Sequence, residues 1–258
     1  MKIEDLFSVR GKIVLVTGGS RGLGEMMARA YVENGAKVYI SARNAQVCAE
    51  LAKELSAFGE CIAIPADLST MEEIDRLAAE MRQREKRIDV LVNNAGASWG
   101  GAFNEFPEAG WDKVMDLNVK SVFFLTQRLI DLLEAAATSE SWARVINIGS
   151  IEGIRTMHLE AYSYAASKAA VNHLTRLMAK FLAPRHIAVN GIAPGYFPSK
   201  MTAALGDEGL QEVAEAAPMK RTGSPEDIAG IALYLASKAS GFVCGAVIPV
   251  DGGLATTA

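Results

Sequence analysis

The chain has 258 residues, of which half are hydrophobic and 22% are charged, and its formal net charge is −4. This composition is typical of a globular protein with a sizeable core. No block of basic residues provides the electrostatic footprint of a nucleic-acid-binding protein. The apolar runs are far shorter than the ~18 residues of a membrane-spanning helix, and the first residues are too acidic for a signal peptide. We therefore expect a cytoplasmic protein that binds neither nucleic acid nor a membrane.

The cysteines and histidines show no pattern of metal ligands. Cys48, Cys61 and Cys244 are odd in number and scattered, which suits reduced thiols in a cytosol. The three histidines stand at no ligand spacing from a cysteine or a pair of carboxylates. We expect no metal site.

Strand-like and helix-like segments alternate along the chain. The expected strands are residues 12–17, 37–41, 61–64, 89–92, 145–148, 186–190 and 247–250. The expected helices are residues 25–34, a stretch ending near 58, one after Ser69 as N-cap, 111–137, about 160–182, and one with Ser224 as cap and Pro225 in the first position. Such alternation implies right-handed crossovers and a parallel sheet. The sequence predicts one α/β domain over residues 1–258, a doubly wound (Rossmann) fold with a seven-stranded parallel sheet and helices on both faces.

A glycine-rich turn follows the first expected strand. Gly18, Gly22 and Gly24 allow the backbone to approach a phosphate, and the next helix presents its positive N-terminal end there. In doubly wound sheets, ligands bind at the carboxyl ends of the strands. A tight turn without a ligand is the alternative, but the strand before it and the helix after it favour a dinucleotide site.

The end of the second expected strand indicates which dinucleotide binds. An NAD site needs an acidic residue there to hold the ribose hydroxyls, whereas this chain has Ser41, Ala42 and Arg43. Arg21 lies within the glycine-rich turn, and two arginines can bind a 2′-phosphate bidentately. The sequence therefore predicts NADP(H).

A serine, a tyrosine and a lysine form the candidate catalytic group. Tyr164 and Lys168 are four residues apart and share one face of the expected helix, and a neighbouring ammonium favours the phenolate. Ser150 follows an expected strand, where its hydroxyl could hold a carbonyl oxygen. Tyr162, six residues before Lys168, points to another side of the helix. A solvated helix face is the alternative, because this spacing alone is weak, but the group as a whole predicts carbonyl/alcohol chemistry.

Taken together, these residues resemble the short-chain dehydrogenase/reductase family from residue 12 to about residue 253. The motifs are TGxxxGxG at 17–24, NNAG at 93–96, Asn118, Ser150, Tyr164-x-x-x-Lys168 and Pro194-Gly195. The resemblance implies that Tyr164 is the catalytic acid/base and that Ser150 positions the carbonyl. It further implies that Lys168 lowers the tyrosine pKa and holds the nicotinamide ribose, and that Asn118 holds a water in the proton relay.

The resemblance also implies the remaining residues of the site. The predicted cofactor-binding residues are Gly18, Ser20, Arg21, Gly22, Leu23, Arg43, Asp67, Leu68, Asn94, Ala95, Gly96, Tyr164, Lys168, Pro194, Gly195 and Phe197. Candidate substrate residues, each in a loop after a strand, are Trp99, Met157, His158, Tyr196 and Met201. Methionine and aromatic residues are equally compatible with plain core packing.

Within this family, segments 93–101, 146–150 and 193–202 are similar to bacterial 3-oxoacyl reductases, especially those of rhamnolipid biosynthesis. The implied activity is NADPH-dependent reduction of a 3-oxoacyl thioester of CoA or acyl carrier protein to the 3-hydroxyacyl form. Fatty-acid enzymes of this type use arginines at the site mouth for the carrier protein. Arg185 could match one of them, but none stands near Ser141, which leaves CoA thioesters and small ketones open.

Two other functions remain compatible with the sequence. A sugar or gluconate-type dehydrogenase, or a cyclic-ketone dehydrogenase, with NADP(H) shares much of the pattern. A non-catalytic NADP(H)-binding sensor or scaffold is possible because fold does not fix function, although the chain keeps the serine, tyrosine and lysine. By resemblance, we also expect a homo-oligomer, either dimer or tetramer, joined through the helices near 111–137 and 160–182 and the C-terminal strand.

Overall fold

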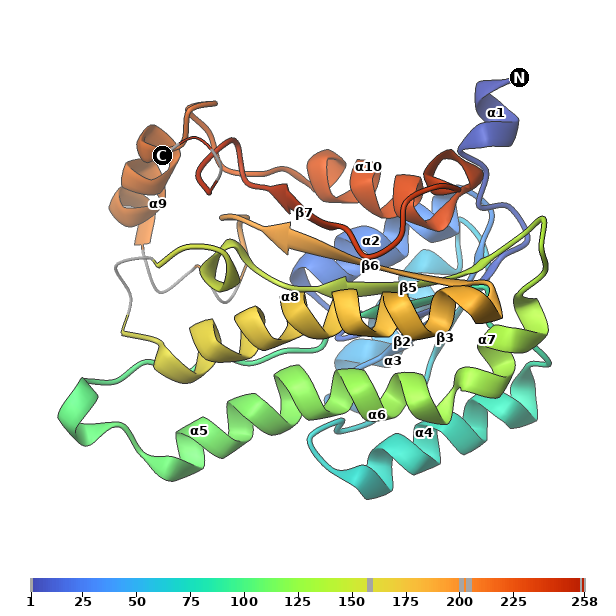
Figure 1. Ribbon diagram of the computed structural model, residues 1–258, viewed down its shortest axis with the longest axis horizontal. Coiled ribbons are helices and arrows are strands. Elements are labelled where there is room, and N and C mark those ends of the chain that lie inside the picture. Colours follow the sequence, from blue (N-terminus) through green and yellow to red (C-terminus); the bar gives the residue numbers. More distant parts are fainter. Residues whose placement is uncertain (1, 157–159, 200–201, 203–205, 256, 258) are drawn as a thin grey trace.

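The computed structural model describes residues 2–156, 160–199, 202, 206–255 and 257 (Figure 1). In this part of the chain, seven strands pair into one sheet, and every neighbouring pair is parallel. The strands are β1 (Ile13–Thr17), β2 (Lys37–Ser41), β3 (Cys61–Ala63), β4 (Val90–Asn93), β5 (Ala143–Ile148), β6 (Ile187–Pro194) and β7 (Val247–Val250). Their order is β3-β2-β1-β4-β5-β6-β7, so the chain reverses direction across the sheet between β1 and β4. This topology confirms the predicted doubly wound α/β fold.

Helices cover both faces of the sheet (Figure 1). One layer contains α2 (Gly22–Glu33), α3 (Ala45–Leu55) and α10 (Pro225–Ala236). The other contains α4 (Met71–Arg84), α5 (Glu108–Met115), α6 (Ser121–Arg128), α7 (Ile130–Ala136) and α8 (Tyr162–Leu182). Two further helices, α1 (Ile3–Leu6) and α9 (Gly206–Ala216), bury no residue of their own.

Side chains along β1 alternate between two cores. Val14 and Val16 pack in the core on the α2 side, and Leu15 packs in the core on the α4 side. All three are fully buried, which explains why residues 13–16 form a continuous apolar run. Full burial of one such side chain stabilises the fold by about 1.5–3 kcal/mol.

The helix expected over residues 111–137 is divided. Its first part, α5, begins earlier, at Glu108, and is followed by a π-helical turn, η2 (Asp116–Lys120). After α6, Leu129 leaves helical geometry with φ −99° and ψ 8°, and α7 follows. A π-turn inserts one extra residue into the helical ladder and is frequent at functional sites. Here it contains Asn118, whose side chain is bonded outside the helix.

A helix cap, the end of a strand and the presence of one helix also differ from the expectation. The N-cap of α4 is Thr70, whose hydroxyl accepts a hydrogen bond from the Glu73 N–H at 3.3 Å, because Ser69 is bonded to Asp67 instead. The sixth strand extends from Ile187 to Pro194, and α9 was not expected. The predicted start of α10 is confirmed, with Ser224 as N-cap and Pro225 in the first position.

Within the described ranges, no helix is long and apolar enough to cross a bilayer. The described residues also contain no group of three histidine, cysteine or carboxylate side chains arranged to hold a metal ion.

Candidate active site

A cavity of about 1140 Å³ opens at the carboxyl ends of the central strands. Its walls come from the segments after β1 to β6, from α5 and η2, and from the first half of α8. Every predicted cofactor residue except Asp67 lines it. The Asp67 carboxylate instead accepts hydrogen bonds from the backbone and hydroxyl of Ser69, at 3.1 and 2.9 Å. Asp67 therefore shapes the turn before α4, and its neighbour Leu68 faces the cavity.

A network of polar side chains holds the glycine-rich turn. The Asn94 amide donates to the carbonyls of Thr17 and Gly18 at 2.8 and 3.1 Å. In return, the Thr17 hydroxyl accepts from the N–H groups of Asn94 and Ala95, at 2.9 and 3.0 Å. Gly18 has φ +62°, and a Cβ there would lie 2.8 Å from the Asn94 amide nitrogen. Only glycine therefore fits this position.

The lining of the cavity suits a polyanionic nucleotide. Among its described residues, four are basic, namely Arg21, Arg43, Lys113 and Lys168, and none is acidic. The N-terminus of α2 also opens into the cavity at Gly22. Arg21 and Arg43 are exposed and stand where the sequence placed a 2′-phosphate. The residues present therefore fit NADP(H).

Lys168 is buried at the reacting end of the cavity. It is 5% exposed, and its Nζ donates to the Ile148 carbonyl at 2.8 Å. The same nitrogen lies 5.6 Å from the centre of the Tyr164 ring. Burial disfavours the ammonium and lowers the pKa of Lys168 to about 8. This lysine is therefore charged only in part near pH 8.

The pKa of Tyr164 shifts in the direction opposite to the one expected from the sequence. Burial, together with the nearby Glu152 and Tyr196, raises the pKa of the Tyr164 phenol to about 12, although the hydroxyl of Ser150 acts in the other direction. Burial dominates because the phenolate would lose its hydration, and no lowering by Lys168 accompanies it. Tyr164 is therefore protonated at neutral pH, as a proton donor must be.

Tyr162 points away from the catalytic group, as predicted. Its hydroxyl donates to the Glu160 carboxylate at 2.8 Å, and its ring makes edge-on contacts with Phe103 and Phe106.

Asn118 connects the loop after β4 to the helix that carries Tyr164. Its Oδ1 accepts from the Ala97 N–H at 2.8 Å, and its Nδ2 donates to the Ala97 carbonyl and the Ser167 hydroxyl, both at 2.9 Å. Ser167 in turn donates to the Tyr164 carbonyl at 2.7 Å. Asn118 is 1% exposed and is absent from the described lining of the cavity. The structure gives its side chain a holding role between the two elements.

Two of the five candidate substrate residues lie in the described part of the chain. Trp99 packs over Gly110, and the Lys113 ammonium lies 5.2 Å from its ring. Tyr196 packs against the small cluster formed by Ile151, Ala217 and Leu254. Neither is part of the described cavity lining. Met157, His158 and Met201 lie outside the described residues.

Sequence reasoning missed several residues that line the cavity. Those with polar or charged side chains are Ser41, Asn44, Ser98, Lys113, Ser199 and Thr202. Most are neighbours of predicted residues, so a wider window around each motif would have found them. Lys113 has no such signal, because it comes from α5.

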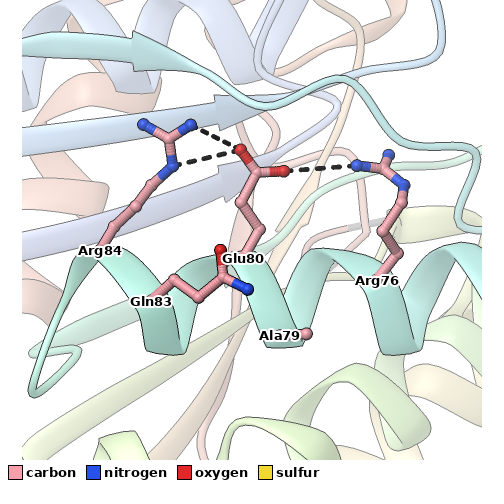
Figure 2. Close-up of a pocket in the computed structure, with 5 residues that line it drawn as sticks. All are labelled: Arg76, Ala79, Glu80, Gln83 and Arg84. Carbon is pink, nitrogen blue, oxygen red and sulfur yellow. Dashed lines mark hydrogen bonds and ion pairs between the residues drawn. The ribbon is translucent and has the colours of Figure 1, made fainter.

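A second hollow lies on one helix, α4, and offers no comparable chemistry (Figure 2). Its charged groups pair with one another. The Glu80 carboxylate lies 3.3 Å from the Arg76 guanidinium and 2.6 Å from that of Arg84. This hollow is a self-paired helix surface.

Comparison with known proteins agrees with this geometry. The family model described as enoyl-(acyl carrier protein) reductase matches residues 18–255. A rhamnolipids biosynthesis 3-oxoacyl-[acyl-carrier-protein] reductase from Pseudomonas aeruginosa is 51% identical over 96% of this chain and 97% of its own length. A 5-keto-D-gluconate 5-reductase from Escherichia coli is 38% identical over 98% of both chains.

Solved structures give the same result. The P. aeruginosa RhlG/NADP active-site complex superposes with a TM-score of 0.94 at 50% identity, covering 97% of this chain and 99% of that one. A gluconate 5-dehydrogenase from Burkholderia cenocepacia, in complex with NADP and tartrate, gives a TM-score of 0.92 at 32% identity and covers all of both chains. With the family model and the long, closely similar relatives in agreement, this chain belongs to the short-chain dehydrogenase/reductase family.

Proposed function

We propose that this protein is an NADPH-dependent carbonyl reductase that converts a 3-oxoacyl thioester, of CoA or acyl carrier protein, to the 3-hydroxyacyl form. The proposal depends on one observation: Ser150, Tyr164 and Lys168 lie at one end of a cavity in whose described lining every charged residue is basic. The 51% identity to a 3-oxoacyl reductase supports the choice of substrate.

NADPH supplies the hydride when it is bound. Arg21 and Arg43 would hold its 2′-phosphate, and Lys168 would lie beside the nicotinamide ribose. The Ser150 hydroxyl orients the ketone oxygen, and the Tyr164 phenol, protonated at neutral pH, donates its proton to that oxygen. The Asn118 side chain keeps the loop after β4 and the Tyr164 helix in register while this occurs.

The carrier of the acyl group is the open part of the proposal. The Arg185 guanidinium pairs with the Glu134 carboxylate at 2.6 Å, so its charge is engaged within the chain. This pairing supports a CoA thioester over a carrier protein docked at Arg185. The relatives named for acyl carrier protein support the opposite choice.

A sugar-type ketone is the second candidate substrate, favoured by the 38% identity to a 5-keto-D-gluconate reductase. Consumption of NADPH and of NADH should be followed with acetoacetyl-CoA, an acetoacetyl carrier protein, 5-ketogluconate and cyclohexanone. NADPH-dependent turnover of the thioesters, abolished in Tyr164→Phe, is the expected result. Turnover of 5-ketogluconate alone would keep the chemistry and reject the substrate class. NADPH binding without turnover of any ketone would instead favour the sensor or scaffold.

We further propose one cytoplasmic domain that assembles with copies of itself. Large apolar side chains are exposed along α5, α6 and α8, which lie next to one another (Figure 1). They are Trp111, Phe123, Leu177 and Phe181, at 41%, 40%, 48% and 64% exposure. A second copy covering this face would remove them from water. Light scattering after size-exclusion chromatography should give a dimer or tetramer, and a charged residue in place of Phe181 should weaken it.

A further inference from the structure

Glu152 is held directly beside the catalytic group. It lies in a single 3-10 turn, η3 (Ile151–Gly153), that begins immediately after Ser150. Its backbone N–H donates to the Ser150 hydroxyl oxygen at 3.2 Å. On the other side, Gly153 packs so closely on α8 that a Cβ there would lie 2.5 Å from the carbonyl carbon of Lys168. The turn is therefore fixed between the serine and the helix that carries the tyrosine.

Glu152 is half-buried, and two phenols lie near it. It lies close enough to Tyr164 and Tyr196 for its charge to raise the pKa of both. Tyr196 in turn packs beside Ile151, the residue before Glu152. Burial raises the pKa of Glu152 itself, and no cation among the described residues counteracts this. Among the described residues, an acidic group therefore stands near the proton donor with no cation that lowers its pKa.

This carboxylate reverses the charge found in the rest of the site. All charged residues of the described cavity lining, including Arg43 and Lys168, are basic, and Ser150 and Tyr164 lie at the reacting end of the cavity. Glu152 lies two residues past that end, on the side of Tyr164 where Tyr196 lies. The basic lining residues therefore attract a nucleotide. An anionic substrate at the reacting end is repelled by the Glu152 carboxylate, which is partly buried.

We propose that Glu152 determines substrate charge: it disfavours ketones that carry a carboxylate near the reacting carbonyl and leaves neutral ketones, such as 3-oxoacyl thioesters, unaffected. This inference deepens the proposed function and rests on it for the position of the ketone at Tyr164. Its physical basis is repulsion between like charges, the means by which sites reject a wrong partner of similar shape. A 3-oxoacyl thioester is uncharged at carbon 1, whereas a free 3-oxo acid and a keto-aldonate are anions.

The test uses two substrates with the same ketone and different charge, acetoacetate and its N-acetylcysteamine thioester. The measured quantity is the ratio of kcat/KM for the anion to kcat/KM for the thioester. In Glu152→Gln this ratio should rise at least about tenfold, because the repulsion is removed and the shape is kept. Glu152→Asp, which retains the charge, should leave the ratio near that of the natural protein.

Glu140→Gln is the matched control. Glu140 is exposed in the loop before β5, at the end of that strand opposite to Ser150, and the substitution makes the same change in net charge. Its ratio should equal that of the natural protein. An equal ratio in Glu152→Gln and Glu140→Gln would overturn the inference, and so would faster reduction of 5-ketogluconate than of neutral ketones by the natural protein.

Failure of the proposed function gives a different result. If the natural protein does not reduce the thioester, the proposed function is wrong. The ratio of kcat/KM is then measured for 3-oxocyclohexanecarboxylate against cyclohexanone. If Glu152→Gln does not fold, Glu152→Ala replaces it, and the charge-retaining Glu152→Asp remains the reference. A ratio that rises with loss of the charge supports the inference with either pair of substrates, and an unchanged ratio rejects it.

Discussion

The two ends of the catalytic cavity differ in how their polar groups are paired. Thr17 and Asn94, around the glycine-rich turn, and Asn118, behind the cavity lining, are neutral, and their side chains are bonded to neighbouring loops. At the reacting end, Tyr164 is half-buried and Lys168 is buried, and burial shifts the pKa of both. Shifted pKa values gather where chemistry is done. The comparison separates side chains that hold the loops from side chains that react.

Beneath the site, a second neutral network joins the same elements. The Asn93 amide donates to the Thr126 hydroxyl at 3.1 Å and to the side-chain Oδ1 of Asn147 at 2.9 Å. Asn147 in turn donates to the Thr175 hydroxyl at 3.0 Å. These buried bonds connect β4, β5, α6 and α8. A fully paired buried network rigidifies its surroundings, so this network should restrict the movement of the helix that carries Tyr164 and Lys168.

The largest effect should follow removal of the reacting hydroxyl. Tyr164→Phe should lower kcat/KM by about 10²–10⁴-fold, the usual contribution of a positioned proton donor. Because Tyr164 belongs to the reacting end, the free energy of unfolding should change little. Steady-state kinetics and urea unfolding measure the two quantities. Undiminished turnover would remove Tyr164 from the catalytic group.

The side chains that hold the loops should respond in the opposite way. Asn118→Ala removes a side chain bonded to Ala97 and Ser167 and leaves buried donors and acceptors unpaired. The free energy of unfolding should fall by about 2–4 kcal/mol, measured by urea denaturation. Asn34→Ala, which loses a bond within its own helix terminus, should cost much less. Equal losses in the two variants would contradict the holding role.

The same division explains how far the sequence could predict the protein. Apolar runs before Gly18 and Ser150 were enough to predict their strands and to place their loops at one edge, whereas β6 continues past its predicted end at residue 190 to Pro194. The candidate catalytic residues and most candidate cofactor residues were named from short motifs near those ends. Asp67 was assigned to the cofactor, but its carboxylate is bonded to its own turn. Side chains in such turns can bond locally or face a ligand, and a motif does not distinguish the two.

Properties that depend on burial or on distant contacts could not be read from the sequence. The sign of the Tyr164 pKa shift depends on burial, which the spacing to Lys168 does not reveal. The π-turn around Asn118 interrupts a helix whose apolar pattern looks continuous. Glu152 gave no signal because its importance comes from the approach of Tyr164 and Tyr196, which only the fold creates.

Burial of Lys168 should make stability depend on pH. Its pKa falls from 10.5 to about 8 on folding, so between these values the unfolded chain binds more protons and stability rises with pH. Relative to Lys168→Met, the natural protein should gain about 1–2 kcal/mol between pH 8 and pH 9.5. Urea unfolding of both proteins at the two pH values measures the difference, and other titrating groups cancel because both proteins carry them. Parallel pH dependences would show that Lys168 keeps its ordinary pKa in the folded protein.

The smallest expected effect lies at the nucleotide end, where the groups are exposed. Arg43→Ala removes a cation that lines the cavity at the end of β2, and KM for NADPH should rise about tenfold, the value of one hydrogen bond to a charged group. KM for NADH, which lacks the 2′-phosphate, should not change. Arg10→Ala removes the same charge from a site beside Gly35 and is the control. An equal rise for both cofactors would mean that Arg43 contributes only general positive charge, whereas a rise for NADPH alone would assign it the 2′-phosphate. Higher salt should reduce the effect because the guanidinium is exposed, unlike the losses expected at half-buried Tyr164 and buried Asn118.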